Sequence, residues 1–450
     1  MAAFLRRQIL RLYEMATGRH IYSVMSQLDH NQWLSQAELL QLQHQKLYKM
    51  LTNAYQFVPY YQRIFDEVGF QPDQILSDIN HIRKLPILTK PIIQENFDDL
   101  LTTEATRRAE LRRLSTSGST GQPLTFMQDS NFRDYFTAYL QYHLSWGGWQ
   151  IGLPHAYMGG ASFETADRSS LREQLMDWTW NRFSTNAYSL SNEKLLEFAL
   201  QARQKRPILL YGYASSIFYF AKFVQENDFS DIKFKSIFSS AEVLYPDQRQ
   251  LIEDVFEAKI FDRYATRELG EIGSQCPAQK GLHLSLENVY VEVLDDEGNP
   301  TQPGQPGNII VTNLTNYGMP FIRYNLADVV AWHPDDHCPC GRNHPMLSVV
   351  EGRHNDMFKT RDGRIVWGGI TNPLWDIEGI KQFQFVQKSY DLVVVRVVKE
   401  GELLEAARQN VIKAIHAALD DKVTVQFEFP TEIPVEKSGK YRYQICEISD

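Results

Sequence analysis

The chain has 450 residues and a formal net charge of −9, and 43% of its residues are hydrophobic and 22% charged. This length supports two or three domains with large cores, and the composition is ordinary for a globular protein. The negative charge and the absence of a DNA- or RNA-binding motif exclude general nucleic-acid binding. No apolar run is long enough for a signal peptide or a membrane span, and four cysteines are too few for a disulfide framework. We therefore expect a soluble, cytoplasmic protein.

The first twenty residues predict an amphipathic helix with Phe4, Leu5, Ile9, Leu12 and Tyr13 near one side. Such a helix packs on its own domain or, in the alternative interpretation, makes a peripheral contact with a membrane or a partner. The remainder of the chain up to about residue 110 is also expected to be mostly helical.

The stretch LSTSGSTGQPLTF, residues 114–126, is rich in hydroxyl side chains and glycine. Glycines let a backbone approach a ligand closely, and hydroxyl and N–H groups bind an anion. The stretch is not the common P-loop, because Gln122 follows Gly121 where that motif has lysine. It predicts either a phosphate-binding loop or a polar turn between strands.

Beyond residue 110, short β-rich runs alternate with helical patterns, which indicates an α/β fold. The expected strands are 156–159, 208–213, 236–240, 259–264, 289–294 and 308–314, with a helix over 245–257. In the last hundred residues we expect a hairpin over 357–366, strands over 392–398 and 423–429, and a helix over 402–419. We therefore predict a large first domain, residues 1–352, and a small α+β domain, residues 353–450.

Five further segments carry polar residues suited to chemistry. They are SSAEVL (239–244), YATRE (264–268), IRYNLADVV (322–330), EGRHND (351–356) and VEKSGKYR (435–442). Together with the 114–126 loop, their order and spacing resemble the adenylate-forming superfamily of acyl-CoA synthetases. The resemblance is closest to the phenylacetate–CoA ligase-like family, in particular its capsular-polysaccharide-biosynthesis branch, and it covers nearly the whole chain.

This resemblance implies a large N-terminal domain of mixed β-sheets with flanking helices and a small, mobile α+β C-terminal domain. It implies that the loop residues that embrace the β- and γ-phosphates of ATP are Ser117, Gly118, Ser119, Thr120 and Gly121. It further implies that the residues around the adenosine are Ser240, Ala241, Glu242, Tyr264, Asp328 and Arg353. In this set Asp328 accepts hydrogen bonds from both ribose hydroxyls, and Arg353 contacts the nucleotide near the hinge.

Three residues are implied to act in catalysis. Glu268 matches the acidic residue that engages Mg²⁺, a hard cation that takes oxygen ligands. Lys440 matches the lysine that bridges the substrate carboxylate and the α-phosphate, where an ammonium stabilises charge on both reacting oxygens. Arg267 contacts either a phosphate or a substrate carboxylate, or it pairs with a neighbouring acid.

The sequence departs from the superfamily pattern at three places. Leu124 follows the loop proline where many members have lysine, and Arg267 stands where a hydroxyl residue is usual. Asn355 occupies the hinge position that is often Asp or Lys, which leaves the pivot residue open.

Cys276, His283, Cys338 and Cys340 predict a structural Zn²⁺ site, because three thiolates and one imidazole complete a closed tetrahedral set. Relatives in the phenylacetate-like family carry a similar cysteine cluster. The alternatives are another nearby histidine in place of His283, or reduced thiols without a metal. The candidates for that replacement are His333, His337 and His344.

The resemblance thus implies an ATP-dependent, AMP-forming ligase that activates a carboxylic acid as an acyl-adenylate. The acyl group would then pass to coenzyme A, or to an amine, a hydroxyl of a glycan precursor or a carrier protein in surface-polysaccharide biosynthesis. Two alternatives stay open: an adenylyltransferase that acts on a hydroxyl, and a non-catalytic nucleotide-binding assembly protein.

Overall fold

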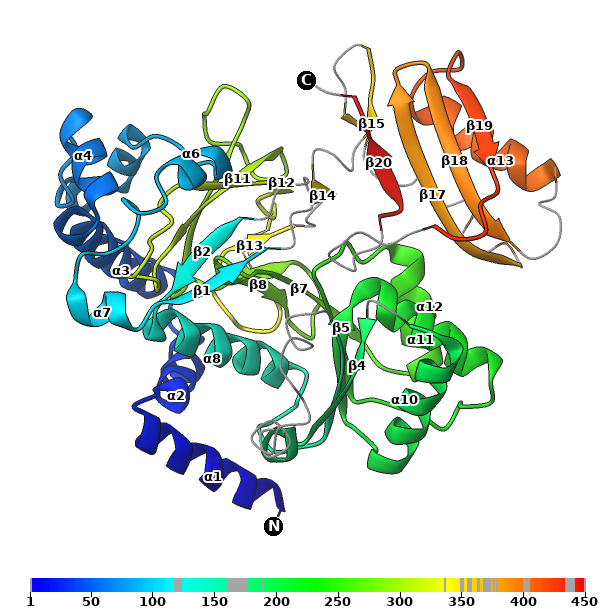
Figure 1. Ribbon diagram of the computed structural model, residues 1–450, viewed down its shortest axis with the longest axis horizontal. Helices are drawn as coiled ribbons and strands as arrows, with labels where there is room; N and C mark the ends of the chain where they lie inside the picture. The colour runs from blue at the N-terminus through cyan, green and yellow to red at the C-terminus, as the bar shows by residue number, and fades with distance from the viewer. Residues whose placement is uncertain are drawn as a thin grey trace.

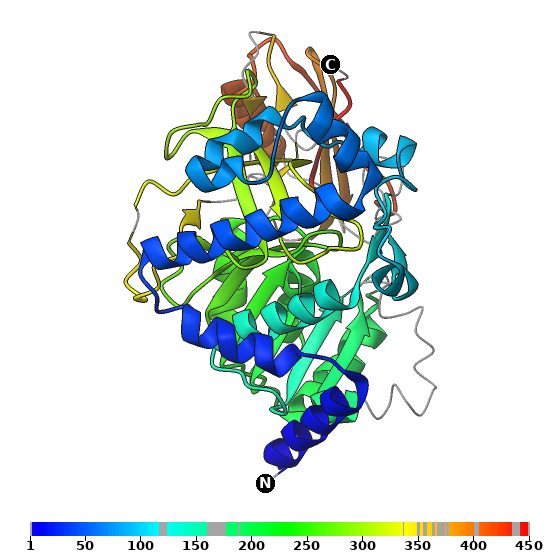
Figure 2. The same ribbon diagram turned by 90° about the vertical axis from the view of Figure 1, so that its left-hand side faces the viewer.

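The structure is a computed structural model that describes most of the chain (Figure 1). The residues outside this description are 1, 117–123, 160–176, 188–189, 336, 349–351, 354–357, 362–364, 367–373, 375–376, 378, 400–404, 434–441 and 449–450. Helix α1 lies at the opposite end of the molecule from the C-terminal sheet, as Figures 1 and 2 both show.

The first 110 residues are mostly helical, as the sequence predicts. The helices are α1 (Ala2–Thr17), α2 (Ile21–Asn31), α3 (Gln36–Phe57), α4 (Pro59–Glu67), α5 (Gln74–Ser77), η1 (Ile79–Lys84), α6 (Lys90–Glu95) and α7 (Ala105–Ala109). Local chemistry explains where the longest one starts. Ser35 accepts the backbone N–H of Glu38, and the Glu38 side chain accepts the N–H of Ser35, so that a capping box opens α3.

The centre of the fold is an eight-stranded mixed sheet in the order β13-β9-β8-β7-β6-β5-β3-β4. Its strands are β3 (His155–Gly159), β4 (Arg182–Asn186), β5 (Leu209–Tyr213), β6 (Ser236–Ser240), β7 (Ile260–Thr266), β8 (Gly270–Gln275), β9 (Leu282–Leu284) and β13 (Met346–Leu347). Strands β4, β3, β5, β6 and β7 are parallel, and β8, β9 and β13 continue the sheet antiparallel.

Helices cover both faces of this sheet, as an α/β architecture requires. One face packs on α10 (Asn192–Lys205), α11 (Ala214–Glu226) and α12 (Pro246–Phe256), and Ile237 and Ile260 lie in that core. The other face packs on α8 (Ser130–Trp146), where Phe238 and Phe261 meet Leu144. Helix α12 and strands β3, β5, β6 and β7 confirm the predicted segments to within a few residues.

A second sheet lies beside the first and has the order β10-β11-β12-β14. Its antiparallel strands are β10 (Val289–Leu294), β11 (Pro306–Asn313), β12 (Tyr324–Ala331) and β14 (Gly352–Arg353). Helices α3 and α4 cover it through a core that includes Leu47, Leu51 and Phe65 (Figure 2). A short hairpin of β1 (Arg112–Ser115) and β2 (Thr125–Gln128) stands next to both sheets (Figure 1).

The last part of the chain forms a four-stranded sheet, β19-β18-β17-β20, and a small hairpin. The sheet strands are β17 (Ile380–Ser389), β18 (Leu392–Lys399), β19 (Thr424–Glu428) and β20 (Gln444–Cys446), and the hairpin pairs β15 (Phe358–Lys359) with β16 (Ile365–Val366). Helix α13 (Glu405–Ala418) connects the parallel strands β18 and β19, which confirms the predicted β-α-β unit. The predicted turn of the small hairpin lies outside the described residues.

Candidate active site

Two of the predicted segments lie at the ends of neighbouring strands of the large sheet. Strands β6 and β7 are parallel, with Ser240 opposite Arg263. Their carboxyl ends therefore meet at one edge, which is where open α/β sheets bind ligands. Ser240 ends β6, Ala241 and Glu242 follow it, and Tyr264 lies near the end of β7.

A hydrogen bond joins two of the predicted nucleotide-binding residues, which are far apart in the sequence. The Tyr264 hydroxyl donates to Oδ2 of Asp328 at 2.6 Å. This distance lies within the usual range for an O–H donor and an oxygen acceptor. Asp328 is only 8% exposed, and it pairs through the backbone with Arg353 of β14. The contact therefore connects the end of β7 in the large sheet with β12 and β14 in the second sheet.

Both partners of this hydrogen bond lie at a β-bulge. The register of β7 and β8 shifts between Tyr264 and Ala265. On the other side, the pairing of β11 with β12 shifts so that residues 326–328 face Ile309. Ala327 has a φ of 60°, and its backbone N–H donates to Oδ1 of Asn325 at 2.8 Å. Bulges re-aim side chains beside active sites, and here they direct Tyr264 and Asp328 toward each other.

The segment after β6 has a strained backbone and a fixed carboxylate. Ala241 has a φ of 71°, a conformation that costs a non-glycine residue about 1–2 kcal/mol. Oε2 of Glu242 accepts the backbone N–H of Ser215 at 2.8 Å, at the start of α11. The Glu242 side chain is thus bound to the N-terminus of α11.

Arg267 and Glu268 occupy the turn between β7 and β8, and the turn is tied to the β1–β2 hairpin. An η nitrogen of Arg267 donates to the carbonyl of Ser115 at 2.9 Å, and Nε2 of Gln128 donates to the carbonyl of Arg267 at 2.8 Å. Glu268 is buried at the same turn. The predicted catalytic acid is therefore held next to the stem of the predicted phosphate loop.

That stem is closed by its own hydrogen bonds. The backbone N–H of Thr116 donates to the carbonyl of Leu124 at 2.8 Å, and the N–H of Leu124 donates to Oγ1 of Thr116 at 3.0 Å. The predicted loop residues Ser117, Gly118, Ser119, Thr120 and Gly121 lie between these two and outside the described residues.

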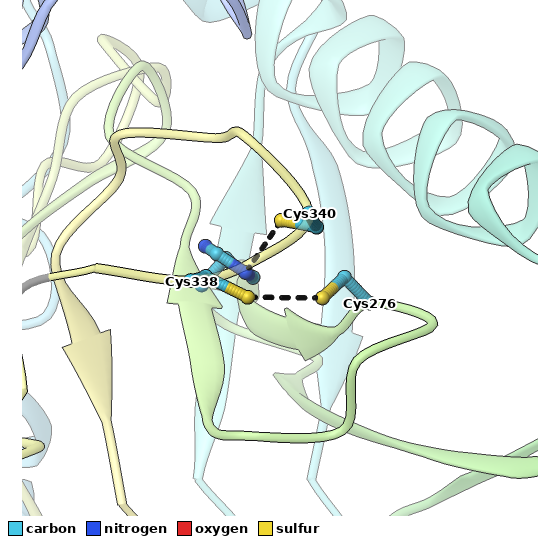
Figure 3. A group of neighbouring side chains, drawn as sticks. Cys276, Cys338 and Cys340 are labelled. Atoms are coloured by element: carbon cyan, nitrogen blue, oxygen red, sulfur yellow. Dashed lines mark hydrogen bonds between the residues drawn. The ribbon is translucent and has the colours of Figure 1, made fainter.

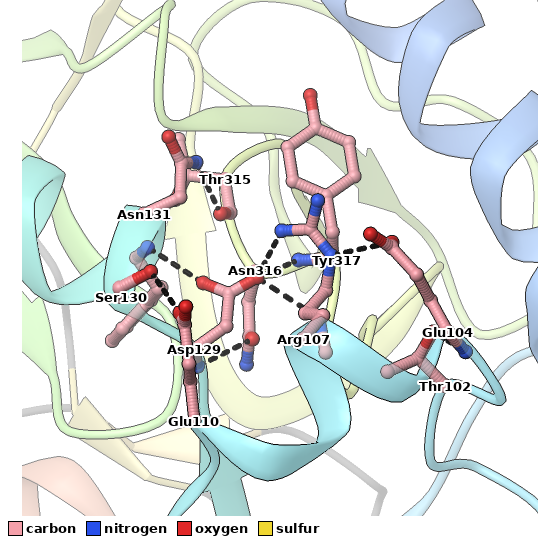
Figure 4. Close-up of polar contacts among 12 residues, drawn as sticks. Thr102, Glu104, Arg107, Glu110, Asp129, Ser130, Asn131, Thr315, Asn316 and Tyr317 are labelled. Carbon is pink, nitrogen blue, oxygen red and sulfur yellow. Dashed lines mark hydrogen bonds and ion pairs between the residues drawn. The ribbon is translucent and has the colours of Figure 1, made fainter.

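Asp129, which the sequence analysis did not single out, anchors the other end of the hairpin (Figure 4). Its fully buried carboxylate accepts the backbone N–H groups of Phe132, Tyr317 and Gly318 at 2.8–3.1 Å, and an η nitrogen of Arg107 at 3.0 Å. Burial raises the pKa of Asp129 despite these donors. One side chain thus joins α7, the start of α8 and the loop after β11. The sequence does carry a signal for this residue, because Asp-Ser-Asn before an apolar run is a pattern of helix capping.

A second buried network, which the sequence analysis did not predict, lies on the face of the large sheet that packs on α8, opposite helices α10, α11 and α12. Oε2 of Glu271 accepts Nε of Arg263 at 2.9 Å and lies 3.2 Å from Nδ1 of His143 on α8. Burial lowers the pKa of His143. Isolated charged residues in three separate segments give no sequence signal of such a network.

Lys440 and Asn355 lie outside the described residues, and so does the Arg353 side chain, although β14 places the Arg353 backbone. Tyr443, three positions after Lys440, packs on the large sheet's helices. Its ring centroid lies 5.8 Å from that of Tyr245, and its hydroxyl accepts Nε2 of Gln248 at 3.4 Å. Tyr443 is therefore held against α12.

The four predicted metal ligands come together in space (Figure 3). One donor atom from each of Cys276, His283, Cys338 and Cys340 lies within 4.8 Å of every other. The Sγ atoms of Cys276 and Cys338 are 3.5 Å apart, and Sγ of Cys340 is 3.4 Å from Nε2 of His283. All four cysteines of the chain are free thiols. The structure therefore brings together the four side chains that the sequence singles out, with His283 as the imidazole.

The chemistry of the donors fits a soft divalent cation. Burial raises the pKa of Cys276 to about 12, so a cation is needed to keep this thiol ionised. Burial also acts to raise the pKa of Cys340, but hydrogen bonds from His283 and from the backbone of Arg342 outweigh it and bring the pKa to about 5. Three sulfurs and one imidazole in a buried cluster match a closed zinc set.

The chain resembles known proteins over most of its length. Residues 357–447 match the family described as the CapK C-terminal domain. The chain is 23% identical to protein CapK of Staphylococcus aureus, over 91% of this chain and 90% of that one. It is also 23% identical to a phenylacetate–coenzyme A ligase of Thermus thermophilus, over 91% and 96% of the two chains. A crystal structure of 2-hydroxyisobutyryl-CoA ligase in the postadenylation state superposes with a TM-score of 0.75 at 20% identity, covering 92% of this chain and 90% of that chain.

The large mixed sheet, the second sheet and the small C-terminal sheet form a fold similar to that of this ligase. The relatives named CapK and phenylacetate–coenzyme A ligase agree with the family resemblance that the sequence motifs indicate. Among the described residues, no helix has the length and apolar character needed to cross a bilayer.

Proposed function

We propose that the protein is an ATP-dependent, AMP-forming ligase that activates a carboxylic acid as its acyl-adenylate. The observation that supports this most strongly is the 2.6 Å bond between Tyr264 and Asp328, because it joins two separately positioned strands into one nucleotide platform. The acyl-CoA ligase names of the relatives support the same activity.

The residues of this platform bind the adenosine part of ATP. The Asp328 carboxylate accepts the two ribose hydroxyls, and the Tyr264 hydroxyl holds that carboxylate in place. The strained backbone at Ala241, with its neighbours Ser240 and Glu242, lies along the adenine, and Arg353 contacts the nucleotide near the hinge. The residues that take the β- and γ-phosphates are Ser117, Gly118, Ser119, Thr120 and Gly121, at the tip of the hairpin whose stem Arg267 holds.

The chemistry requires charge neutralisation at the α-phosphate. A substrate carboxylate oxygen attacks the α-phosphorus, and the bond to the pyrophosphate oxygen breaks. Lys440 stabilises the charge on the attacking and α-phosphate oxygens. Glu268 holds Mg²⁺, which supplies the counter-charge for the triphosphate when it is bound. Arg267 positions the phosphate loop through the Ser115 carbonyl.

We also propose a division into a large domain, residues 1–352, and a small mobile domain, residues 353–450. In this arrangement the small domain brings Lys440 to the acyl-adenylate site and then rotates for the second step. The separate β17–β20 sheet supports this division.

Coenzyme A is the proposed acceptor of the acyl group, since the named ligase relatives form CoA thioesters. The CapK relationship instead supports an amine, a glycan hydroxyl or a carrier protein in surface-polysaccharide biosynthesis.

We propose that Cys276, His283, Cys338 and Cys340 hold a structural Zn²⁺. These four ligands would form a closed set, and the ion would join the β8–β9 region to the loop before β13. Cys276 and Cys338 also pack with Ile21, Val24 and Leu28 of α2, so the site supports the attachment of that helix. The thiols stay reduced in the cytoplasm, where we place the protein.

The products of the reaction test this function. The full chain is incubated with ATP, Mg²⁺, a panel of carboxylic acids and hydroxylamine, which traps acyl-adenylates as hydroxamates. A ligase yields AMP, pyrophosphate and an acid-derived hydroxamate in matched amounts. Pyrophosphate release without a hydroxamate and with AMP retained on a hydroxyl product identifies an adenylyltransferase. ATP binding without any turnover across the panel contradicts the ligase assignment and favours the assembly protein.

A further inference from the structure

Helix α1 turns an apolar stripe away from the rest of the protein. Of its large apolar side chains that the structure describes, Leu10 is buried, against Leu144 and Trp149. The exposed ones are Phe4 at 62%, Leu5 at 53%, Leu12 at 60% and Met15 at 73%. At roughly 100° of rotation per residue, these four side chains fall within about a third of the helix circumference. A surface helix of a globular protein normally packs such a stripe on the core, whereas here it faces outward.

The orientation of α1 is fixed by polar and backbone contacts on its other face. The buried carboxylate of Glu14 accepts the backbone N–H of Tyr22 at 3.1 Å. The backbone of Ala3 lies against Gly152, where an added Cβ would stand 2.7 Å from the Ala3 carbonyl oxygen. Because these contacts hold the helix, the stripe stays on the surface.

The charge around the stripe is positive, although the whole chain carries −9. Arg6, Arg7 and Arg11 lie on α1, and its one acidic residue, Glu14, is buried on the far side. Arg11 stacks on Tyr22 at 5.2 Å, and Arg6 donates to the carbonyl of Trp178 at 2.9 Å. These contacts hold the guanidinium groups of Arg6 and Arg11 where the helix meets the rest of the protein.

We propose that α1 binds an anionic lipid surface, with Phe4, Leu5, Leu12 and Met15 at the boundary between headgroups and acyl chains. An apolar stripe flanked by arginine is the pattern of helices that lie in a membrane interface. A second copy of the chain fits this face less well, because two α1 helices would bring like-charged arginines together.

The test is sedimentation of the full-length protein with phosphatidylcholine vesicles that contain half phosphatidylglycerol, and with phosphatidylcholine vesicles alone. The test variant is Leu12→Gln/Met15→Gln. The matched control is Leu76→Gln, because Leu76 on α5 is 62% exposed but lies outside α1. Arg11→Gln tests the charge. All the substituted side chains are exposed, and circular dichroism verifies that each variant is folded.

We expect the wild type and Leu76→Gln to bind the anionic vesicles equally, and the double variant to bind roughly tenfold or more weakly. Arg11→Gln and added sodium chloride should both weaken binding. Absence of binding to anionic vesicles, or undiminished binding by the double variant, overturns the proposal. A concentration-dependent dimer that the double variant abolishes, without vesicle binding, overturns it in favour of a second copy.

Discussion

Replacing Tyr264 by phenylalanine removes one hydroxyl and leaves the ring in place. That hydroxyl donates to Asp328 at 2.6 Å, and Asp328 is 8% exposed. A hydrogen bond to a charged group contributes about 1.5–3 kcal/mol. Tyr264 itself is half-buried, so water reaches the site and the lower end of that range applies. If Asp328 binds the ribose, a loss of about 1.5 kcal/mol of positioning raises the KM for ATP roughly tenfold.

The assay is acid-dependent ATP turnover at varied ATP, together with urea unfolding of the same proteins. Tyr48→Phe is the matched control, because it removes a half-buried tyrosine hydroxyl on α3, remote from the platform. We expect Tyr264→Phe to raise the KM for ATP and to lower the free energy of unfolding by about 1.5 kcal/mol, while Tyr48→Phe changes the KM little. An unchanged KM together with unchanged stability would refute the platform argument.

Ala241→Gly removes the steric strain of a side chain in the left-handed region and should raise the free energy of unfolding by about 1 kcal/mol. It should also make the segment after β6 less rigid and so raise the KM for ATP. Glu257→Gly, at φ 52° after α12, should give a similar gain without a change in KM, and equal KM values in both variants would contradict a role for Ala241. Burial lowers the pKa of His155 to about 3, so this residue is neutral in the folded protein and protonates on unfolding below its ordinary value of 6.5. The contribution of His155 to stability is therefore present above that value and is lost as pH falls, by about 2 kcal/mol between about pH 7 and pH 5. His155→Asn should make the free energy of unfolding, measured by urea titration, less dependent on pH. An unaltered pH dependence would show that other groups control it. Cys340→Ser should lower both the melting temperature and the zinc content, the latter measured by inductively coupled plasma mass spectrometry, whereas Cys446→Ser should retain zinc. Wild-type protein without zinc would contradict the metal site.

Local patterns predict much of the architecture. The run SIFSS gives β6 with both bounds correct, and VYVEVL gives β10, because each is a short run that contains β-branched or aromatic residues. The cysteine cluster is also predicted, since ligand type alone restricts which residues can meet around a zinc ion.

Other elements depend on tertiary context. Strand β17 is missing from the predicted strands, although its alternation of glutamine with phenylalanine is a strand pattern; its pairing with both β18 and β20 depends on tertiary context. The contact between Tyr264 and Asp328 spans 64 positions and depends on two bulges, which no local pattern encodes. Asp129 and the network of Glu271, Arg263 and His143 likewise arise from packing between distant segments.

The central claim is adenylation of a carboxylic acid, and ATP–pyrophosphate exchange measures it most directly. The full chain is assayed with and without each acid, beside a Lys440→Ala variant. We predict exchange that requires an acid and that falls roughly a hundredfold or more in Lys440→Ala, as expected for removal of a charge at the transition state. Exchange that is independent of any acid, or undiminished in Lys440→Ala, would contradict the account.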